Sequence, residues 1–449
     1  KNVSISSFAL PYLQGLTLDP VTCGDGTQQD IGCLLYEGLV QLDLEMQPQA
    51  VLAQSWSYDA ASYTWTIQLR SGVTFTDGSA FTASDAAATV RRAQTSARYS
   101  GRLSQVASIR ADGAQTLVIR LTRPNSSFIS LLDIPIVKSG TETDLVPLGP
   151  GRYAYVAAAG TEGAYLTANR SWWQQKSLPM DRIDLYTCKN SDTVSYAFYA
   201  REVQLLHCDL SDTASTGAVS SGDFTDADTT VLHYLGFNTS RAPFNSAELR
   251  RAVSQGIDRA SCVSSFLMGH GTAAEYPIHP SSALYPDKQP QAYSPDDFNT
   301  AIAAAGYGSD ASPVSVTLLV NSESAHKRDA AAKIAAALST SALQVSIAAV
   351  PWSEFVARLK SGNFDLYYGE YKMTADWDLT ELLTGSCNYG RYTGADLTAL
   401  LAAERTAQGS AHDTAAAKLY AAFQAQMPFA PICFERSSVL TISGVIQGL

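Results

Sequence analysis

The sequence has little positive charge. Its 449 residues include 31 Lys and Arg against 42 Asp and Glu, which gives a net charge of −11. The isoelectric point is about 5.0. Because no basic excess exists to displace the counterions of a polyanion, we expect neither nucleic acid nor an anionic membrane surface as a partner.

A long apolar run is also missing. No stretch reaches the roughly 18 apolar residues that a transmembrane helix requires. The sequence opens with Lys1-Asn2-Val3-Ser4, which resembles the trimmed start of a mature protein, and no signal peptide is visible in it.

The sequence holds none of the catalytic motifs that spacing alone identifies. It has no GxSxG elbow, no HExxH pair and no phosphate-binding loop. The six histidines are scattered, and His270 and His279 share a loop at a spacing unlike common metal sites. We therefore expect no enzyme, no metal and no cofactor. One alternative of another class stays open, a secreted hydrolase that uses the carboxylate pair Asp376 and Asp378.

Cysteine pairs of the Cys-x-x-Cys type are absent, which argues against a structural zinc site. The seven cysteines are an odd number, so at least one thiol is unpaired in a monomer. Two interpretations stay open: mostly buried free thiols, or one to three disulfides formed in an oxidising extracellular compartment.

The length is sufficient for two or three domains, and the most regular segment runs from Tyr63 to Arg92. Apolar and polar residues alternate over 63–70, which predicts a strand with one buried face. Asp77-Gly78 predicts a tight turn. Thr82 and Asp85 then have the spacing of a capping box before an Ala-rich helix.

A strand–helix–strand unit is predicted over residues 183–188, 192–203 and 204–210. Crossovers of this kind connect parallel neighbouring strands. Cys188 and Cys208 would then lie near the ends of adjacent strands, which makes them one candidate disulfide.

Strands and helices alternate again over residues 314–371, which indicates a second α/β lobe. Trp352, Phe355 and Leu359 share one face of a helix within it. A single long helix is predicted over 399–424, and the strand that follows it should return to the first lobe.

Several segments carry sequence motifs that resemble those of one protein family. Leu69–Asp85 reads LR-SGV-x-F-x-DG-x-x-x-TASD, and Leu235–Arg259 carries FN, PF and IDR at characteristic distances. Both resemble the bacterial extracellular solute-binding proteins of family five, the oligopeptide, dipeptide and nickel type that serve ABC importers. Shorter matches are YEGL (Tyr36–Leu39), PLGPGRYAY (Pro147–Tyr155) and L-x-x-N-x-x-W-W (Leu166–Trp173).

The resemblance implies an α/β protein with a two-lobed, hinge-linked periplasmic-binding-protein fold of type II, in which an extra α+β domain is inserted in the first lobe. The expected bounds are 1–44, 171–237 and 428–449 for the first lobe, 45–170 for the inserted domain and 238–427 for the second lobe. Cys23 and Cys33 would bracket a loop that the family places at the ligand cleft, and they form the second candidate disulfide.

The resemblance also implies a function. The protein would be a monomer that captures a solute between two closing lobes and delivers it to a membrane permease. A short peptide is the preferred solute, with a nickel or metallophore complex or an oligosaccharide as alternatives. The family implies a periplasmic protein or a cell-surface lipoprotein of Gram-positive bacteria.

The expected solute-binding residues lie mainly after the strand that follows Phe364-Asp365. In peptide-binding members an aspartate in this loop holds the α-amino group of the peptide, and Asp376 is the nearest candidate, while an ungapped alignment places Thr374 at that position. Aromatic and polar side chains would complete the pocket. The full expected set is Asp19, Tyr36, Trp352, Tyr371, Lys372, Asp376, Trp377, Asp378, Tyr389 and Arg391.

Overall fold

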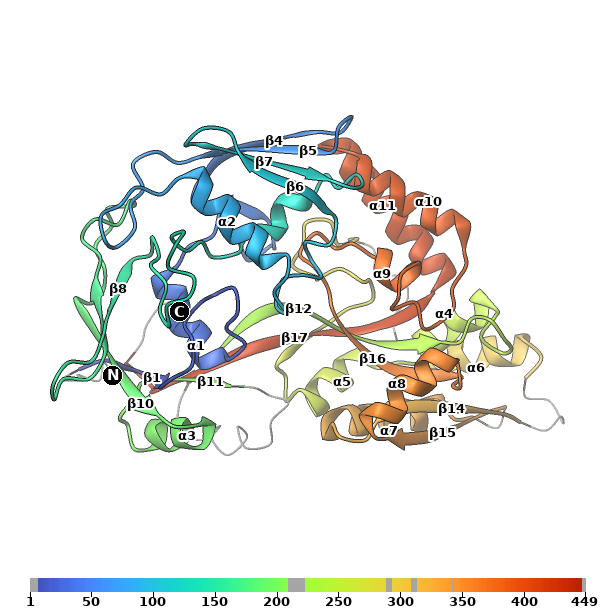
Figure 1. Cartoon of the computed structure of the whole chain (residues 1–449). Helices are drawn as coiled ribbons and strands as arrows, with labels where there is room; N and C mark the ends of the chain where they lie inside the picture. The colour runs from blue at the N-terminus through green and yellow to red at the C-terminus, as the bar shows by residue number, and fades with distance from the viewer. Residues whose placement is uncertain (1–6, 209–222, 288–292, 308–312, 341, 446–449) are drawn as a thin grey trace. The chain divides into compact units, whose positions relative to one another are not determined.

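The computed structural model (Figure 1) describes residues 7–208, 223–287, 293–307, 313–340 and 342–445. The chain divides into two compact units. Unit 1 comprises residues 1–226 and 438–449, and unit 2 comprises residues 227–437. The chain crosses between the units within two long strands, β12 (Asp223–Phe237) and β17 (Phe429–Thr441).

The first sheet of unit 1 has four strands, in the order β1 (Ala9–Leu13), β10 (Arg182–Cys188), β9 (Tyr165–Ala168) and β8 (Tyr153–Val156). β1 and β10 are parallel, and the other neighbours are antiparallel. Helix α1 (Gly26–Leu35) begins after Asp25, whose side chain accepts a hydrogen bond from the Gln28 amide. Burial of Ile31 and Leu35 joins α1 to the core of this sheet.

A second sheet of unit 1 is antiparallel, in the order β4 (Ala53–Asp59), β5 (Thr64–Leu69), β7 (Thr116–Leu121) and β6 (Val106–Ala111). The alternation predicted for β5 is confirmed, because Trp65, Ile67 and Leu69 are buried. Helix α2 (Ala83–Ala93) contacts β6 and β7, and its predicted capping box between Thr82 and Asp85 is present. This sheet and α2 enclose a core of their own.

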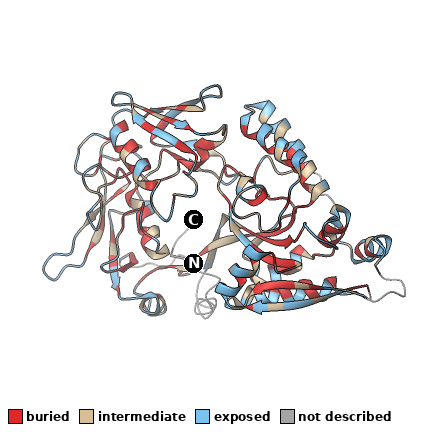
Figure 2. Cartoon of the chain, turned by 45° about the vertical axis from the view of Figure 1, so that its right-hand side comes forward, coloured by how far each residue is buried: buried red, intermediate tan, exposed pale blue. Residues whose placement is uncertain are grey.

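Unit 2 is built on an extended sheet. The central strand β12 pairs antiparallel with β16 (Leu366–Lys372), and β14 (Val314–Asn321) and β15 (Leu343–Val350) continue the sheet beyond β16. The strand β17 lies on the other side of β12 and pairs with β13 (Gly271–Ala273). Residues 232–237 of β12 and 366–369 of β16, two strands that pair with each other in the sheet, are all buried (Figure 2).

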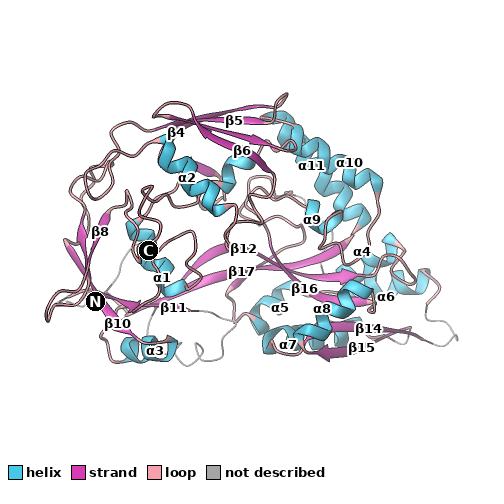
Figure 3. Ribbon diagram, in the orientation of Figure 1, coloured by secondary structure: helices cyan, strands magenta, loops and turns pink. Residues whose placement is uncertain are grey.

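Helices flank the outer strands of this sheet. α7 (Ala325–Leu338) contacts both β14 and β15, and α8 (Trp352–Ser361) contacts β14 (Figure 3). α8 ends at Gly362, whose φ of 74° lies in the left-handed region that glycine adopts without strain. The alternation of strands and helices predicted for residues 314–371 is therefore confirmed.

The remaining strands and helices are divided between the two units. They are β2 (Val40–Leu42), β3 (Pro48–Ala50), η1 (Phe128–Leu131), α3 (Ser191–Tyr199), β11 (Leu205–Cys208), α4 (Ala247–Gln255), α5 (Arg259–Phe266), α6 (Pro295–Ala304), α9 (Thr380–Leu383), α10 (Ala395–Thr406) and α11 (Ser410–Gln426). No helix within the described ranges is both long and apolar enough to cross a membrane.

The predicted pairing of the strands on either side of α3 is wrong. β10 lies in the first sheet of unit 1, whereas β11 pairs antiparallel with residues 438–441 of β17. Residues 209 and 210, the end of the predicted second strand, lie outside the described residues. The partner of β11 is more than 200 positions away in the sequence, so the local strand–helix–strand pattern could not indicate it.

Neither candidate disulfide is formed, since all seven cysteines are free thiols. Cys188 and Cys208 are buried in one apolar cluster, and burial raises the pKa of the Cys208 thiol to about 11. Cys23 is buried and Cys33 is exposed.

The predicted helix over 399–424 is two helices, α10 and α11. The chain turns between them at Gly409, whose φ is 56°. The bounds of the compact units also differ from the predicted lobes, because the units divide β12 and β17 in their interiors instead of at their ends.

Candidate functional site

The short family motifs of unit 1 meet around one glutamate. Glu37, in the YEGL segment, accepts a hydrogen bond from the Nε1 of Trp172 at 2.9 Å and from the Nε1 of Trp173 at 2.6 Å. Burial raises the pKa of Glu37, and the two indole hydrogen bonds offset only part of this effect. The neighbouring Tyr36 is buried and donates from its hydroxyl to the carbonyl of Pro147 at 2.9 Å. These motifs therefore hold α1 against two loops of unit 1, which is a structural role.

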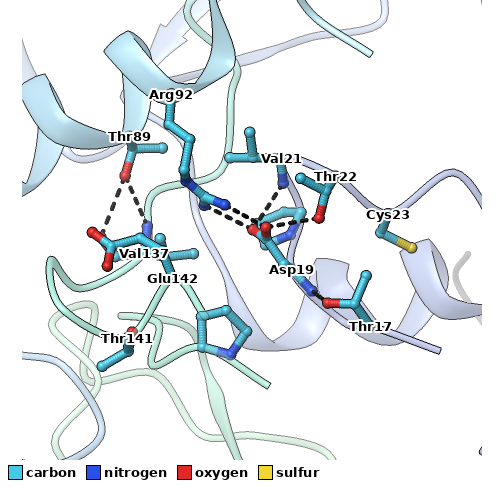
Figure 4. Close-up of polar contacts among 12 residues, drawn as sticks. Thr17, Asp19, Val21, Thr22, Cys23, Thr89, Arg92, Val137, Thr141 and Glu142 are labelled. Atoms are coloured by element: carbon cyan, nitrogen blue, oxygen red, sulfur yellow. Dashed lines mark hydrogen bonds and ion pairs between the residues drawn. The ribbon is translucent and has the colours of Figure 1, made fainter. Parts of the chain in front are cut away.

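Asp19 lies in the loop before α1 and is only 2% exposed (Figure 4). Its carboxylate forms an ion pair with Arg92 of α2 through both oxygens, and the Nη2–Oδ1 distance is 2.8 Å. It also accepts from the Thr22 hydroxyl at 2.8 Å and from the Val21 amide at 3.1 Å.

These contacts decide the charge state of Asp19. Burial would raise its pKa, but the hydrogen bonds from Arg92 and Thr22 outweigh burial and lower it. Asp19, a predicted solute-binding residue, thus links the loop 16–25 to α2 through its ion pair with Arg92.

Asp376, the expected anchor for a peptide amino group, is also paired inside the protein. Its Oδ2 lies 3.1 Å from the Nη1 of Arg405, and its carbonyl accepts from Nη2 of the same residue at 2.5 Å. Arg405 also donates hydrogen bonds to the carboxylate of Glu404. The Oε1 of Glu404 lies 2.8 Å from the Nε2 of His412.

We call Asp376, Arg405, Glu404 and His412 the closed network. Burial would lower the pKa of Arg405, but Glu404 and Asp376 outweigh burial and raise it. Burial likewise raises the pKa of Glu404, and Arg405 and His412 reverse this and lower it. Asp376 is 2% exposed, so in this structure its carboxylate faces the closed network and not solvent.

The other two residues of the Asp-Trp-Asp segment also have internal partners. Trp377 is 5% exposed, and its ring stands edge-on to Phe434 with centroids 5.8 Å apart. Asp378 accepts from the backbone and the hydroxyl of Thr380 at 2.9 and 2.5 Å. Asp376 is thus held by Arg405, and Asp378 by Thr380.

The remaining expected residues are more accessible. Trp352, Lys372 and Arg391 are exposed, and Tyr371 and Tyr389 are half-buried. The ring of Trp352 stacks on that of Phe355, with centroids 5.7 Å apart. The Nη2 of Arg391 donates to the carbonyl of Lys360 at 3.2 Å. Of these five side chains, all in unit 2, those of Trp352, Lys372 and Arg391 are the most exposed of the expected set.

The long motif after β12 has a structural role as well. Asn238 donates to the carbonyls of Gly362 and Phe364 at 3.1 Å each. Arg250 donates to the carbonyl of Met427 at 2.8 Å, and Arg259 donates to that of Pro431 at 2.8 Å. The motif residues thus fix the backbone around β16 and β17, which explains why they identify a fold without naming a solute.

Sequence reasoning missed one cluster, which lies in unit 2. His233, His326, Glu370 and Glu435 each offer one ligand atom, and these four atoms lie within 4.8 Å of one another. His233 is 1% exposed. Burial would raise the pKa of Glu435, but His233 and His326 outweigh it and lower the pKa. The four residues are spread over 203 positions, so no spacing in the sequence could indicate them.

Unit 1 also carries an open groove of about 880 Å³ beside the paired tryptophans. Two residues that line the groove contact each other: the guanidinium carbon of Arg70 lies 4.3 Å from the ring centroid of Trp173. The groove is a surface feature of unit 1, and none of the expected solute-binding residues lines it.

Comparison with known proteins gives a consistent result. A profile described as bacterial extracellular solute-binding proteins, family 5 middle, matches residues 47–388. The glutathione-binding protein GsiB of Escherichia coli K12 is 27% identical over 304 residues, which are 65% of this chain and 59% of that protein. The chain thus spans less than two thirds of the length of this curated relative.

Solved structures show the same fold. The unliganded open form of MppA, a periplasmic murein tripeptide-binding protein, superimposes with a TM-score of 0.83 at 19% identity and covers 98% of this chain and 94% of that one. A nickel ABC transporter protein from Bacillus halodurans superimposes with a TM-score of 0.80 at 22% identity and covers 97% and 94%. The predicted periplasmic-binding-protein fold is therefore confirmed. Since the family profile covers well over half of the chain, this protein belongs to the bacterial extracellular solute-binding proteins of family 5, which are binding proteins and not enzymes.

Proposed function

We propose that this protein is the solute-capturing component of an ABC importer and that its solute is a short peptide. The match to the family 5 profile over residues 47–388 carries this proposal. Such a protein acts outside the cytoplasmic membrane, either in the periplasm or anchored to the cell surface by lipid, and hands its solute to a membrane permease.

The choice of a peptide is supported by two relatives of different kinds. GsiB is named for glutathione, and MppA for a murein tripeptide, and both ligands are small peptides. A peptide offers backbone groups that strand edges can pair and carboxylates that cations can bind. Lys372 and Arg391 are exposed cations of unit 2 that suit an acidic peptide.

The amino group of the peptide requires a carboxylate other than Asp19 or Asp376. Both of these are engaged by arginines inside the protein. Separating Asp376 from Arg405 would leave a buried charge without its partner, which costs about 3–5 kcal/mol. A solute that took this carboxylate would have to supply that energy, so we assign Asp376 to stability instead of recognition.

Hinge bending within β12 and β17, near residues 226–227 and 437–438 where the chain passes from one unit to the other, would accompany capture of the solute.

Thermal melting with candidate solutes tests the proposal. Glutathione and a pool of di- to hexapeptides would be compared with nickel–histidine and with an oligosaccharide pool. A ligand at about 100 times its dissociation constant adds ~2.7 kcal/mol, which is visible as a shift in the melting temperature. We expect shifts with peptides. A shift with nickel–histidine or oligosaccharide alone would overturn the peptide assignment while leaving family membership intact.

A further inference from the structure

Three adjacent strands and one helix of unit 2 bring two imidazoles and two carboxylates together. His233 of β12 and Glu370 of β16 are direct cross-strand partners in the antiparallel register. Glu435 lies on β17, the strand on the other side of β12. His326 lies in the first turn of α7. We call these four residues the histidine–glutamate cluster.

The two rings are held in an orientation that suits metal binding. The Nδ1 of His233 lies 2.8 Å from the Tyr368 hydroxyl, and the Nδ1 of His326 lies 3.2 Å from the Ser324 hydroxyl. In metal sites the second nitrogen of a ligating histidine makes such an outer hydrogen bond, which fixes the ring. Each imidazole therefore directs its Nε2 into the cluster.

Both Nε2 atoms point to the same carboxylate. The Nε2 of His233 lies 2.7 Å from Oε1 of Glu435, and the Nε2 of His326 lies 4.0 Å from the same oxygen. The Nε2 of His326 is buried and makes no hydrogen bond. A buried polar atom without a partner destabilises the folded protein, so a metal ion that accepted the lone pair of this nitrogen would relieve that cost.

We propose that His233, His326, Glu370 and Glu435 bind one divalent transition-metal ion of the zinc, nickel and cobalt class directly through their side chains. Two imidazoles and two carboxylates suit these ions, whereas calcium and magnesium prefer oxygen ligands alone. Two carboxylates also balance the charge of a divalent cation. This inference goes beyond the proposed function, because it does not depend on which solute the protein captures.

The geometry requires only modest adjustment. Bonds of about 2.0–2.2 Å in a tetrahedral site separate the ligand atoms by roughly 3.4 Å. The Nε2 of His233 and the Oε1 of Glu435, which are 2.7 Å apart, would therefore separate slightly, and the other ligand atoms, all within 4.8 Å of one another, would draw closer. Glu370, whose side chain is 37% exposed, is the ligand free to move inward. Its Oε2 already lies 2.5 Å from the Nζ of Lys327, so this lysine either shares the carboxylate with the ion or swings into solvent.

Metal titration of the full chain tests the site. The protein, without a polyhistidine tag and dialysed against a chelator, would be titrated with zinc chloride by calorimetry and with cobalt chloride by visible absorption. We expect saturable binding of one ion per chain and visible cobalt d–d bands with the intensity of a four-coordinate site. Absence of saturable binding at millimolar metal would overturn the proposal.

Variants locate the ion. His326→Ala and Glu435→Gln should each weaken zinc binding by about tenfold or more, because each removes a ligand. His270→Ala, a change of a half-buried histidine of the same unit outside the cluster, should leave the affinity unchanged. Circular dichroism and melting curves check that the variants fold. Affinities of both cluster variants equal to that of the unaltered protein would overturn the site, and so would equal losses in the control.

Discussion

Unit 2 contains two polar clusters of similar composition and opposite character. In the closed network, Arg405 lies between Asp376 and Glu404, and His412 binds Glu404 from the other side. In the histidine–glutamate cluster, two carboxylates and two imidazoles converge with no arginine among them, and Lys327 pairs with Glu370. The comparison indicates that the closed network stabilises the fold, whereas the histidine–glutamate cluster is organised to receive a ligand.

The largest effect is expected from breaking the closed network. Arg405→Met should lower the free energy of unfolding by about 3–5 kcal/mol, because it leaves two buried carboxylates without their cation. Urea unfolding measures this loss. Arg358→Met, which breaks a partly exposed pair with Glu354, should change stability by less than about 1 kcal/mol. Equal effects of the two substitutions would contradict the structural role of the closed network.

Unit 1 offers a smaller test of a paired aspartate. Arg92→Met should cost about 2–3 kcal/mol, since a charged hydrogen-bond partner of the buried Asp19 is lost. The folded-state pKa of Asp19 is lowered, so the stabilisation is fully present above its unfolded pKa of about 3.9. It disappears as the pH falls through the folded pKa.

Unfolding curves at several pH values check this dependence. The difference between Arg92→Met and the unaltered protein should be full at pH 6 and shrink below about pH 4. Arg110→Met, which breaks an exposed pair with Asp112, serves as the control. A difference that stayed constant through the acid range would show that the ionised Asp19 is not its source.

The histidine–glutamate cluster should respond weakly in the absence of metal. His326→Ala, measured in chelator, should change the free energy of unfolding by about 1 kcal/mol or less, because it removes the 3.2 Å contact of Nδ1 with the Ser324 hydroxyl and no hydrogen bond of Nε2. Chemical unfolding beside Arg405→Met makes the comparison direct. A loss as large as that of Arg405→Met would mean that the cluster stabilises the fold by itself.

The smallest effect on stability is expected at the exposed cations. Lys372→Ala should change the free energy of unfolding by less than about 0.5 kcal/mol and weaken the binding of an acidic peptide by about tenfold. Lys360→Ala, another exposed lysine of unit 2, should leave both quantities unchanged. Calorimetry with glutathione measures the affinities. Unchanged affinity in Lys372→Ala would remove this residue from the candidate site.

Local order could be predicted well from the sequence. The strand β5, the capping box of α2 and the strand–helix alternation of β14 to β16 depend on neighbours a few residues apart, and all three are present. The family motifs identified the fold because they hold backbone segments together, as Glu37 does with the paired tryptophans.

The candidate site could be predicted only in part, because partners far apart in the sequence decide it. Asp376 has the residue type of an amino anchor, but Arg405, 29 positions later, occupies its carboxylate. The histidine–glutamate cluster depends on the register of β12 against β16 and on the start of α7. Neither the register nor this long-range pairing is encoded in a short pattern.

The position of β17 near the end of the chain also affects the order in which parts of the protein can fold during synthesis. Residues 438–441 pair with β11, and Leu440 is fully buried in an apolar cluster with Leu13 and Cys188 of unit 1. A ribosome reaches these residues only after it has synthesised every residue of unit 2. This apolar cluster of unit 1 can therefore be completed only after all of unit 2 has been synthesised. Until then its apolar residues remain accessible to chaperones.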